Sequence, residues 1–227
     1  METLSKRLLA AASLSKNEAK IIADIGTDHA FLPVYLIKNN LALKAIACDV
    51  NKGPLMRAES TVKKYLLSEK ISLRLGSGLY PVDIGEADTV FICGMGGSLI
   101  ISILDAEKEK TASFERIILQ PQNDIPKVRK YLYENGFFIE EEKMVFEGGF
   151  YYTVLLVKKG KKTPLSEKEL LFGPFLLKEK SPVFMDYIKY ITEKTLKLQS
   201  LLEEKNSPAS IEKLKETKRM LTLLKEV

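Results

Sequence analysis

Short runs of apolar residues alternate with segments of helical spacing along the first 136 residues of the chain. A short apolar run bounded by glycine or polar residues is typical of a strand buried on both faces of a parallel sheet. Apolar positions three or four residues apart instead indicate an amphipathic helix. By these rules strands are expected at 21–25, 45–48, 71–75, 88–93 and 116–119, and helices at 30–38, 53–67, from 98 onward and at 125–135.

The pattern changes after residue 136. Residues 137–146 and 151–158 read as strands, and only the four residues Glu147-Gly148-Gly149-Phe150 separate them. A connection this short leaves no room for a helix, so the two strands pair antiparallel as a hairpin. Five strand–helix units followed by a hairpin predict an α/β fold with the Rossmann-like, seven-stranded sheet of class I methyltransferases, and not the sheet of a dehydrogenase.

The chain beyond residue 157 has a different composition. A lysine-rich linker at 158–162 precedes two segments of helical spacing, 185–204 and 210–227, which are separated by a break at 206–208. Two long helices joined in this way are expected to pack as an antiparallel, coiled-coil-like hairpin. We therefore predict a domain at residues 1–160, which opens with a short amphipathic helix at 8–14, and a helical domain at residues 161–227.

The first predicted strand ends in the loop Asp24-Ile25-Gly26-Thr27-Asp28-His29. An acidic residue closing a strand, a glycine turn and a following helix N-terminus form the usual nucleotide-binding corner of such a sheet. A dinucleotide fingerprint also needs a second and a third glycine, and those places hold Asp28 and Ala30 here. An aspartate in this loop repels a pyrophosphate but suits a cationic or neutral cofactor such as S-adenosyl-L-methionine.

The ends of the next strands add further candidates, since open α/β sheets bind ligands at the carboxyl ends of their strands. Asp49, followed by Val50, lies where a carboxylate would bind the two ribose hydroxyls, although it is also placed as a helix N-terminal acid. The segment Gly76-Ser77-Gly78 is expected to lie beside the adenine, and the alternative is that it forms only a turn. The segment Gly94-Met95-Gly96-Gly97 contains three glycines, whereas a turn needs only one. It therefore implies close approach of the backbone to a ligand.

Composition and charge narrow the functional classes. The 227 residues are 45% hydrophobic, which is enough for one full core. Residues 1–157 carry 19 Lys+Arg and 20 Asp+Glu, whereas residues 158–227 carry 16 and 10. The basic end indicates either an acidic partner or only a solvated lysine-rich surface. Cys48 and Cys93 lie in apolar runs without metal-ligand spacing, so we expect buried thiols, no metal and a reducing cytoplasm. No run reaches transmembrane length, and we expect a monomer.

Four segments together resemble the bacterial TrmK-type tRNA adenine methyltransferases: 24–33, Asp49 with Gly53-Pro54, 94–97 and 119–121. The resemblance covers essentially the whole chain. It implies methyl transfer from S-adenosyl-L-methionine to ring nitrogen 1 of the adenine at tRNA position 22, with the helical domain binding tRNA. The family pattern continues Leu-Gln-Pro with asparagine, whereas Gln122 intervenes here before Asn123. Either amide is therefore expected to bind the target base, with Tyr151 or Phe150 stacking on it.

The chemistry of this reaction selects a further residue. Ring nitrogen 1 is nucleophilic once unpaired, so alignment with the methyl group is the main requirement. The product adenine is cationic, and a carboxylate beside it would stabilise the transition state. Asp28 is the expected carboxylate, with capping of the following helix as its alternative role, and His29 is expected to be structural. A methyltransferase acting on another RNA, a protein or a small molecule, and a non-catalytic nucleic-acid-binding relative, remain as alternatives.

Overall fold

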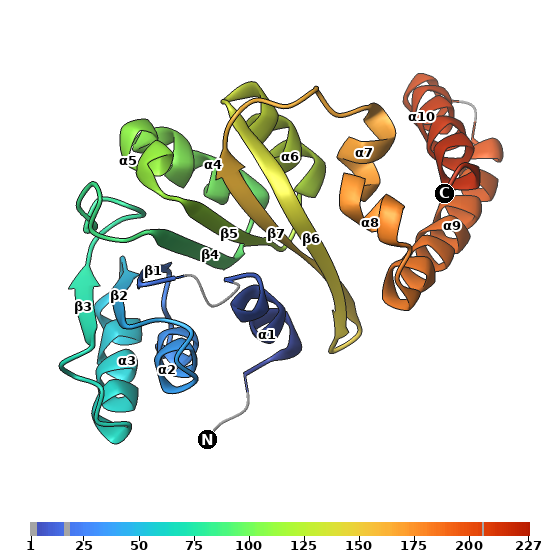
Figure 1. Cartoon of the computed structure of the whole chain (residues 1–227). Helices are drawn as coiled ribbons and strands as arrows, with labels where there is room; N and C mark the ends of the chain where they lie inside the picture. Colours follow the sequence, from blue (N-terminus) through green and yellow to red (C-terminus); the bar gives the residue numbers. More distant parts are fainter. Residues whose placement is uncertain (1–3, 16–18, 206) are drawn as a thin grey trace. The chain divides into compact units, whose positions relative to one another are not determined.

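The computed structural model describes residues 4–15, 19–205 and 207–227. The chain divides after Ser166 into two compact units. The first unit contains a single sheet, and the second contains only helices among its described residues (Figure 1). This division follows the change in composition beyond the lysine-rich linker.

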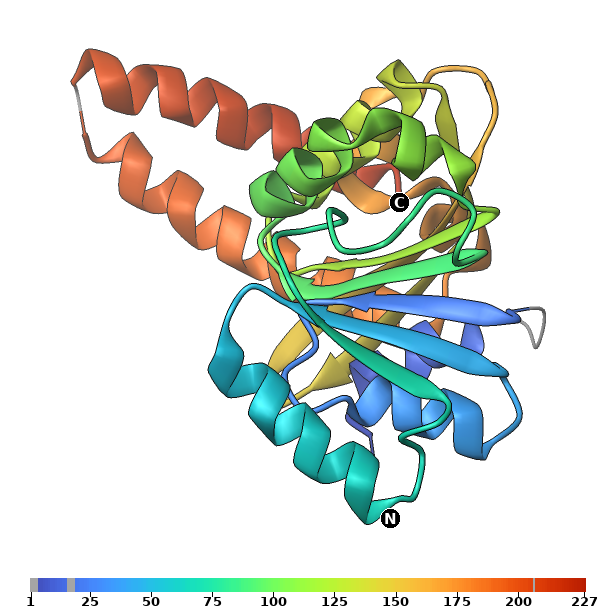
Figure 2. The same ribbon diagram turned by 90° about the vertical axis from the view of Figure 1, so that its left-hand side faces the viewer.

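Seven strands form the sheet of the first unit in the order β3-β2-β1-β4-β5-β7-β6. The first five strands pair in parallel, whereas β7 pairs antiparallel with both β5 and β6. The strands fan across the sheet with the usual twist (Figure 2). This order and the antiparallel hairpin confirm the predicted class I methyltransferase fold. The strands are β1 (Ile21–Ile25), β2 (Lys44–Asp49), β3 (Ile71–Leu75), β4 (Thr89–Met95), β5 (Arg116–Pro121), β6 (Phe137–Glu147) and β7 (Phe150–Lys159).

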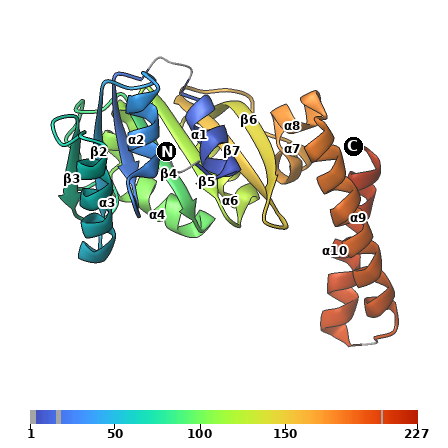
Figure 3. The same ribbon diagram turned by 90° about the horizontal axis from the view of Figure 1, so that it is seen from below.

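Helices cover both faces of this sheet. Three of them, α1, α2 and α3, lie on one face, and α4, α5 and α6 lie on the other (Figures 1 and 3). Their bounds are α1 (Lys6–Ser13), α2 (Phe31–Lys38), α3 (Lys52–Lys64), α4 (Gly97–Ala106), α5 (Lys108–Ser113) and α6 (Ile125–Glu134). The expected helices are present, but α3 ends earlier than its apolar spacing predicts, before Leu66 adopts a φ of 56°. Helix α5 was not predicted.

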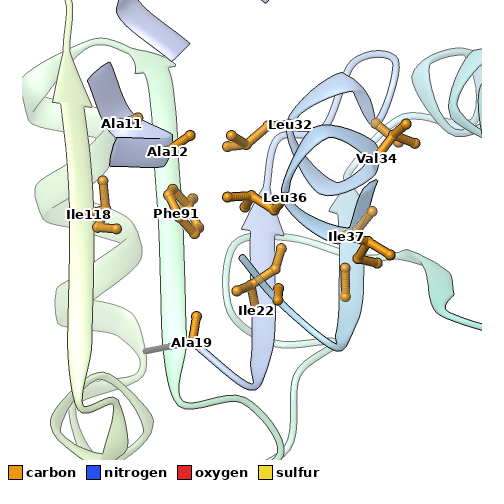
Figure 4. Packing of buried hydrophobic residues seen from close by; sticks show 14 of the residues in the cluster. Ala11, Ala12, Ala19, Ile22, Leu32, Val34, Leu36, Ile37, Phe91 and Ile118 are labelled. Carbon is orange, nitrogen blue, oxygen red and sulfur yellow. The ribbon is translucent and has the colours of Figure 1, made fainter. Parts of the chain in front are cut away.

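The core lies between the sheet and its helices. Ala11 and Ala12 of α1 pack near Phe91 of β4 and Ile118 of β5, and Leu36 of α2 lies over the neighbouring strands (Figure 4). These side chains are all fully or almost fully buried. The alanines let α1 approach the sheet closely, so this helix is part of the core.

The described residues of the second unit form four helices. Two short helices, α7 (Glu167–Phe172) and α8 (Pro174–Glu179), precede the long pair α9 (Pro182–Glu203) and α10 (Pro208–Lys225). A serine side chain caps each long helix, since Ser181 accepts from the Phe184 amide and Ser207 from the Ser210 amide. The two long helices pack against each other as the predicted antiparallel hairpin (Figures 2 and 3). Of the predicted break at 206–208, residue 206 lies outside the described residues.

Candidate active site

The carboxyl ends of β1 and β4 open into a cavity of about 440 Å³. The sheet register pairs Asp24 with Phe91 and Ile25 with Ile92, so the loops that follow the two strands leave the sheet side by side. A volume of this size lies in the range of small-molecule sites. The lining residues come from α1 and the two residues before it, β1, the β1–α2 loop, α2, the end of β4 and the loop after β5: Leu4, Ser5, Arg7, Leu8, Asp24, Gly26, Thr27, Asp28, His29, Ala30, Phe31, Leu32, Cys93, Gly94 and Gln122.

Asp24 lines this cavity and is only 7% exposed. Burial raises the pKa of its carboxyl from 3.8 to about 6, the Thr27 side chain opposes this shift in part, and the nearby Asp49 carboxylate adds to it. Removing a carboxylate from water without a cationic partner is unfavourable. The site is therefore ready to receive a positively charged group.

The turn after β1 depends on Gly26. Its φ is +80°, which is left-handed backbone that favours glycine. A Cβ atom there would come within 2.2 Å of the terminal methyl carbon of Met95. The amides of Gly26 and Thr27 both donate to the Cys48 carbonyl, at 2.8 and 2.9 Å, which ties the loop to β2. Met95 thus packs over the turn and is not among the residues that line the cavity.

Asp28 projects from the same loop but does not cap α2. The N-cap position is Ala30, in the left-handed region, and no side chain accepts a hydrogen bond from the helix start there. The Asp28 carboxylate instead pairs with Arg57 of α3, whose Nε and Nη2 both donate to Oδ1. The capping alternative is therefore wrong. The Asp28 side chain is 64% exposed and lines the cavity, so its charge remains accessible to a ligand.

His29 is held by its neighbours in the loop. Its ring stacks on Phe31, with centroids 5.0 Å apart and planes nearly parallel. Its Nε2 lies 3.5 Å from Oδ2 of Asp28. These contacts fit the structural role that we predicted, although His29 also lines the cavity.

The residues predicted to bind the ribose and the adenine lie along the same edge of the sheet, outside the cavity itself. Asp49 ends β2, and its Oδ1 accepts from the Asn51 amide at 2.7 Å, at the start of α3. Val50 beside it is 62% exposed. The Gly76 amide donates to the Asp49 carbonyl at 3.0 Å, so the loop after β3 is bound to the end of β2.

The local backbone and packing also require glycine in the loop after β3. A Cβ atom at Gly76 would meet the Pro81 ring at 2.6 Å, and Gly78 has a φ of +51°. Ser77 between them is exposed. The plain-turn alternative is sufficient to explain both glycines, and the Ser77 side chain is exposed for contact with a ligand.

The loop after β5 separates the two amides between which the sequence did not decide. Asn123 accepts from the Gly97 amide at 3.0 Å through Oδ1, and a Cβ atom at Gly97 would lie 2.6 Å from the Asn123 carbonyl oxygen. The close approach implied by Gly96 and Gly97 is thus to this segment of the chain itself, since Gly96 also faces the Asn123 amide. Gln122 lines the cavity and Asn123 does not. Of the two side chains, Gln122 is therefore the one that reaches the cavity.

Gly94 lies opposite Gln122 on the β4 side of the cavity. It has a φ of +76°, and its amide donates to Oε1 of the fully buried Gln120 at 3.1 Å. Cys93 before it also lines the cavity. Cys48 is buried as expected, whereas Cys93 is only half-buried. Burial raises the pKa of the Cys93 thiol above its usual range and that of Cys48 to about 12, so both thiols stay protonated.

The sequence did not predict the part of the wall that α1 contributes. Leu4, Ser5, Arg7 and Leu8 line the cavity, and Arg7 also lies over the Tyr152 ring, 5.3 Å from its centroid. The amphipathic spacing of residues 8–14 indicated a helix but carried no signal that its N-terminal end faces the site. Phe150 and Tyr151, the predicted stacking residues, do not line the cavity.

S-adenosyl-L-methionine fits these observations. It is a cation, and the only buried carboxylate among the lining residues, Asp24, lacks a cationic partner in the described structure. No group of three or more potential metal ligands is present in the described ranges, and none of the helices described is long and apolar enough to cross a membrane.

Comparison with known proteins agrees with this interpretation. The family model for TrmK, tRNA (adenine(22)-N(1))-methyltransferase, matches residues 22–225. The tRNA (adenine(22)-N(1))-methyltransferase of Bacillus subtilis (strain 168) is 40% identical over 233 residues, which cover 99% of this chain and 96% of that protein.

Solved structures give the same result. The crystal structure of the B. subtilis TrmK enzyme matches with a TM-score of 0.89 at 37% identity and covers 100% of this chain and 99% of its own. The Streptococcus pneumoniae protein Sp1610, crystallised in complex with S-adenosyl-L-methionine, matches with a TM-score of 0.84 at 37% identity, over 96% of this chain and 100% of its own. The chain belongs to the TrmK family of tRNA (adenine(22)-N(1))-methyltransferases.

Proposed function

We propose that this protein transfers a methyl group from S-adenosyl-L-methionine to ring nitrogen 1 of the adenine at position 22 of tRNA. Family membership supports the reaction. The main structural support in this chain is the cavity at the ends of β1 and β4, which is lined by the buried Asp24 carboxylate, the exposed Asp28 carboxylate and the Gln122 amide. We place the activity in the cytoplasm and assign it to a monomer. Light scattering tests the monomer, for which the expected mass is that of one chain, 25.6 kDa.

The cofactor supplies an electrophilic methyl group on a cationic sulfur. We assign Asp24 to the cationic methionine end of the cofactor, because its buried carboxylate has no cationic partner in the described structure and a positive charge would stabilise it. We assign Asp49 to the two ribose hydroxyls, and Val50, Ser77 and the neighbouring glycine backbone to the adenine. Gly94 allows the backbone to approach the cofactor closely, since a side chain there would be strained by the positive φ.

The target base needs alignment more than activation. Its ring nitrogen 1 is on the Watson–Crick edge, so the adenine must leave its stack to reach the cavity. Gln122 is our choice for the hydrogen bond to that edge, while Asn123 holds the loop through Gly97. The Asp28 carboxylate lies beside the developing positive charge and stabilises it electrostatically. Arg57 pairs with Asp28 in the free protein and fixes its position.

The direct test is the identity of the modified nucleoside. Purified protein is incubated with labelled S-adenosyl-L-methionine and unmodified tRNA, which is then digested and analysed by mass spectrometry. We expect 1-methyladenosine, and no product from a tRNA that carries guanine at position 22. A methylated nucleoside of another kind, or unchanged labelling of the guanine variant, would contradict the proposal and favour one of the alternative substrates.

We further infer that the helical unit binds the tRNA backbone. Several of its basic side chains are already paired with acids, such as Arg219 with Glu167 and Lys218 with Glu203. Within the described part of the chain, the side chains of Lys178, Lys189 and Lys197 form no ion pair and are open to a phosphate. Removing one lysine–phosphate interaction should reduce the slope of log affinity against log salt by about 0.7–0.9.

The double substitution Lys189→Gln and Lys197→Gln tests this inference in the full chain. We expect weaker tRNA binding and a shallower salt slope, with unchanged affinity for the cofactor. Lys215→Gln, on α10 and paired with Glu212, is a matched control for removing one positive charge. Unchanged tRNA affinity and salt slope in the double variant would identify these lysines as a solvated surface only.

A further inference from the structure

The hairpin of β6 and β7 has exposed aromatic side chains at its tip. Phe150 is 66% exposed and Phe146 is 44% exposed. Only Gly148 and Gly149, both with positive φ, separate the two strands, as in a tight two-residue hairpin turn. Large exposed aromatic residues on a short turn contribute little to the core, so they call for a functional reason.

The tip lies at the same edge of the sheet as the cavity. β5 pairs with β7 only where Ile117–Leu119 faces Leu155–Val157. The first residues of β7 therefore extend past the carboxyl end of β5, beside the loop that carries Gln122. The hairpin thus projects from the edge where we place methyl transfer.

The two aromatic residues occupy opposite faces of this hairpin. Phe150 pairs in register with Glu147, and Phe146 pairs with Tyr151, so alternation places Phe150 and Tyr152 on one face and Phe146 on the other. The rings of Phe150 and Tyr152 are 6.4 Å apart. The backbone amide of Lys6 donates to Oε1 of Glu147 at 2.6 Å, which shows that the Phe150 face is the one turned toward α1.

This face continues into the cavity through Arg7. The Arg7 guanidinium lies over the Tyr152 ring and also lines the cavity. Its Nε is buried and has no hydrogen-bond acceptor among the described residues. Phe150, Tyr152 and Arg7 therefore form a row of planar groups that runs from an exposed aromatic ring to a guanidinium at the cavity wall whose Nε lacks an acceptor; we call it the stacking row.

We propose that the stacking row binds an unpaired nucleotide next to the methylated adenine, with the base on Phe150 and a phosphate at Arg7. This inference rests on the proposed function, since it concerns how the substrate RNA is held while one of its bases is extruded. Aromatic rings bind unpaired bases of any sequence by stacking, and a guanidinium binds phosphate oxygens through charge-assisted hydrogen bonds. A nucleotide displaced beside the target adenine would use both contacts, its base stacking on the aromatic ring and its phosphate binding the guanidinium.

The test compares tRNA binding by Phe150 variants of the full chain saturated with S-adenosylhomocysteine. Phe150→Ala should weaken tRNA affinity by about tenfold, which is typical of losing one base–aromatic stack. Phe150→Leu keeps apolar bulk without a flat ring and should be equally weak, whereas Phe150→Trp should bind like wild type. Cofactor affinity, measured by calorimetry, should be unchanged in all three. Equal tRNA affinity of the Leu and Trp variants would overturn the stacking role.

Two controls fix the location. Leu43→Ala removes a side chain that is also 66% exposed, next to the amino end of β2, and should leave tRNA affinity unchanged. Phe146→Ala removes the aromatic ring on the other face of the tip and should have a clearly smaller effect than Phe150→Ala. An equal loss in Phe146→Ala or Leu43→Ala would overturn the assignment to the stacking row.

Arg7→Gln tests whether Arg7 binds a phosphate of the tRNA or the carboxylate of the cofactor. We expect the salt slope of tRNA binding to become shallower by about 0.7–0.9, as for one phosphate contact. Loss of cofactor affinity with an unchanged salt slope would overturn the phosphate contact. Methylation by the wild-type protein is measured in parallel. If the wild type methylates tRNA and Phe150→Ala binds tRNA with normal affinity, this inference is refuted and the proposed function is not.

Discussion

Asp24→Asn should make the free protein more stable and the enzyme less able to bind its cofactor. Burial raises the pKa of Asp24 from 3.8 to about 6. A shift of about two pKa units corresponds to about 3 kcal/mol between the two protonation states. Because the pKa is higher in the folded than in the unfolded state, the folded protein holds more protons between these values, and stability falls as the pH rises through them. Asparagine has the same shape but no charge, so it removes this cost.

The expected difference depends on pH in a defined direction. Above pH 7 the variant should be more stable than the wild type by up to about 3 kcal/mol, and the advantage should shrink by about 2 kcal/mol on lowering the pH to 4.5. Thermal melts of the cofactor-free protein at pH 4.5 and 7.5 measure it, at roughly 2–4 °C per kcal/mol for a chain of this size. Asp28→Asn in the same loop, where the carboxylate is exposed, controls for simple charge removal.

Two results would refute this reasoning. One is an Asp24→Asn variant that is less stable than the wild type at pH 7.5. The other is a stability difference that does not change with pH, because a charge buried at a cost must titrate. The wild type should also bind S-adenosyl-L-methionine more weakly below pH 6, where Asp24 becomes protonated, whereas the variant should bind weakly at every pH.

Four further substitutions test single contacts. Asp49→Ala should weaken cofactor binding by about 1.5–3 kcal/mol in calorimetry, as expected for a charged hydrogen-bonding group, and unchanged affinity would remove the ribose assignment. Asp28→Asn should reduce single-turnover methylation by about 10²-fold with the fold retained, while Arg57→Gln, which breaks the same ion pair, should cost much less; near-normal turnover of Asp28→Asn would leave Asp28 a structural role only. Gly97→Ala brings a Cβ atom within 2.6 Å of the Asn123 carbonyl, so melts should show a loss of about 1–3 kcal/mol and a wild-type melt would contradict the packing.

Much of the fold could be predicted because buried strands and amphipathic helices leave a period in the sequence. The strand at Ile21–Ile25 and the helix at Phe31–Lys38 were expected within a residue of their bounds. Short helices leave too few residues to show a period, and α5, α7 and α8 each span only six. The end of α3 also differed, because apolar spacing continues to Leu67 although the backbone turns at Leu66.

The site was predictable where it depends on backbone, and less so where it depends on side chains meeting across the fold. Strand ends and glycine turns located Asp24, Gly26 and Gly94 from local spacing alone. The pairing of Asp28 with Arg57 joins residues 29 positions apart on different elements, and no local pattern indicates it. The choice between Gln122 and Asn123 likewise depends on a contact with Gly97 in another loop, which only the folded chain brings together.

The buried charge at Asp24 also explains why this loop lacks the glycines of a dinucleotide site. A free protein that buries the Asp24 carboxylate, with the Asp49 carboxylate nearby, raises the pKa of Asp24 and is expected to be less stable than one with an amide in its place. An anionic pyrophosphate would increase that cost, whereas a cationic cofactor removes it by supplying the missing opposite charge. Under the proposed assignment, the same carboxylate that destabilises the empty site favours the sulfonium cofactor over a dinucleotide, and the part of the cavity beside Gln122 receives a base whose methylated form is again a cation.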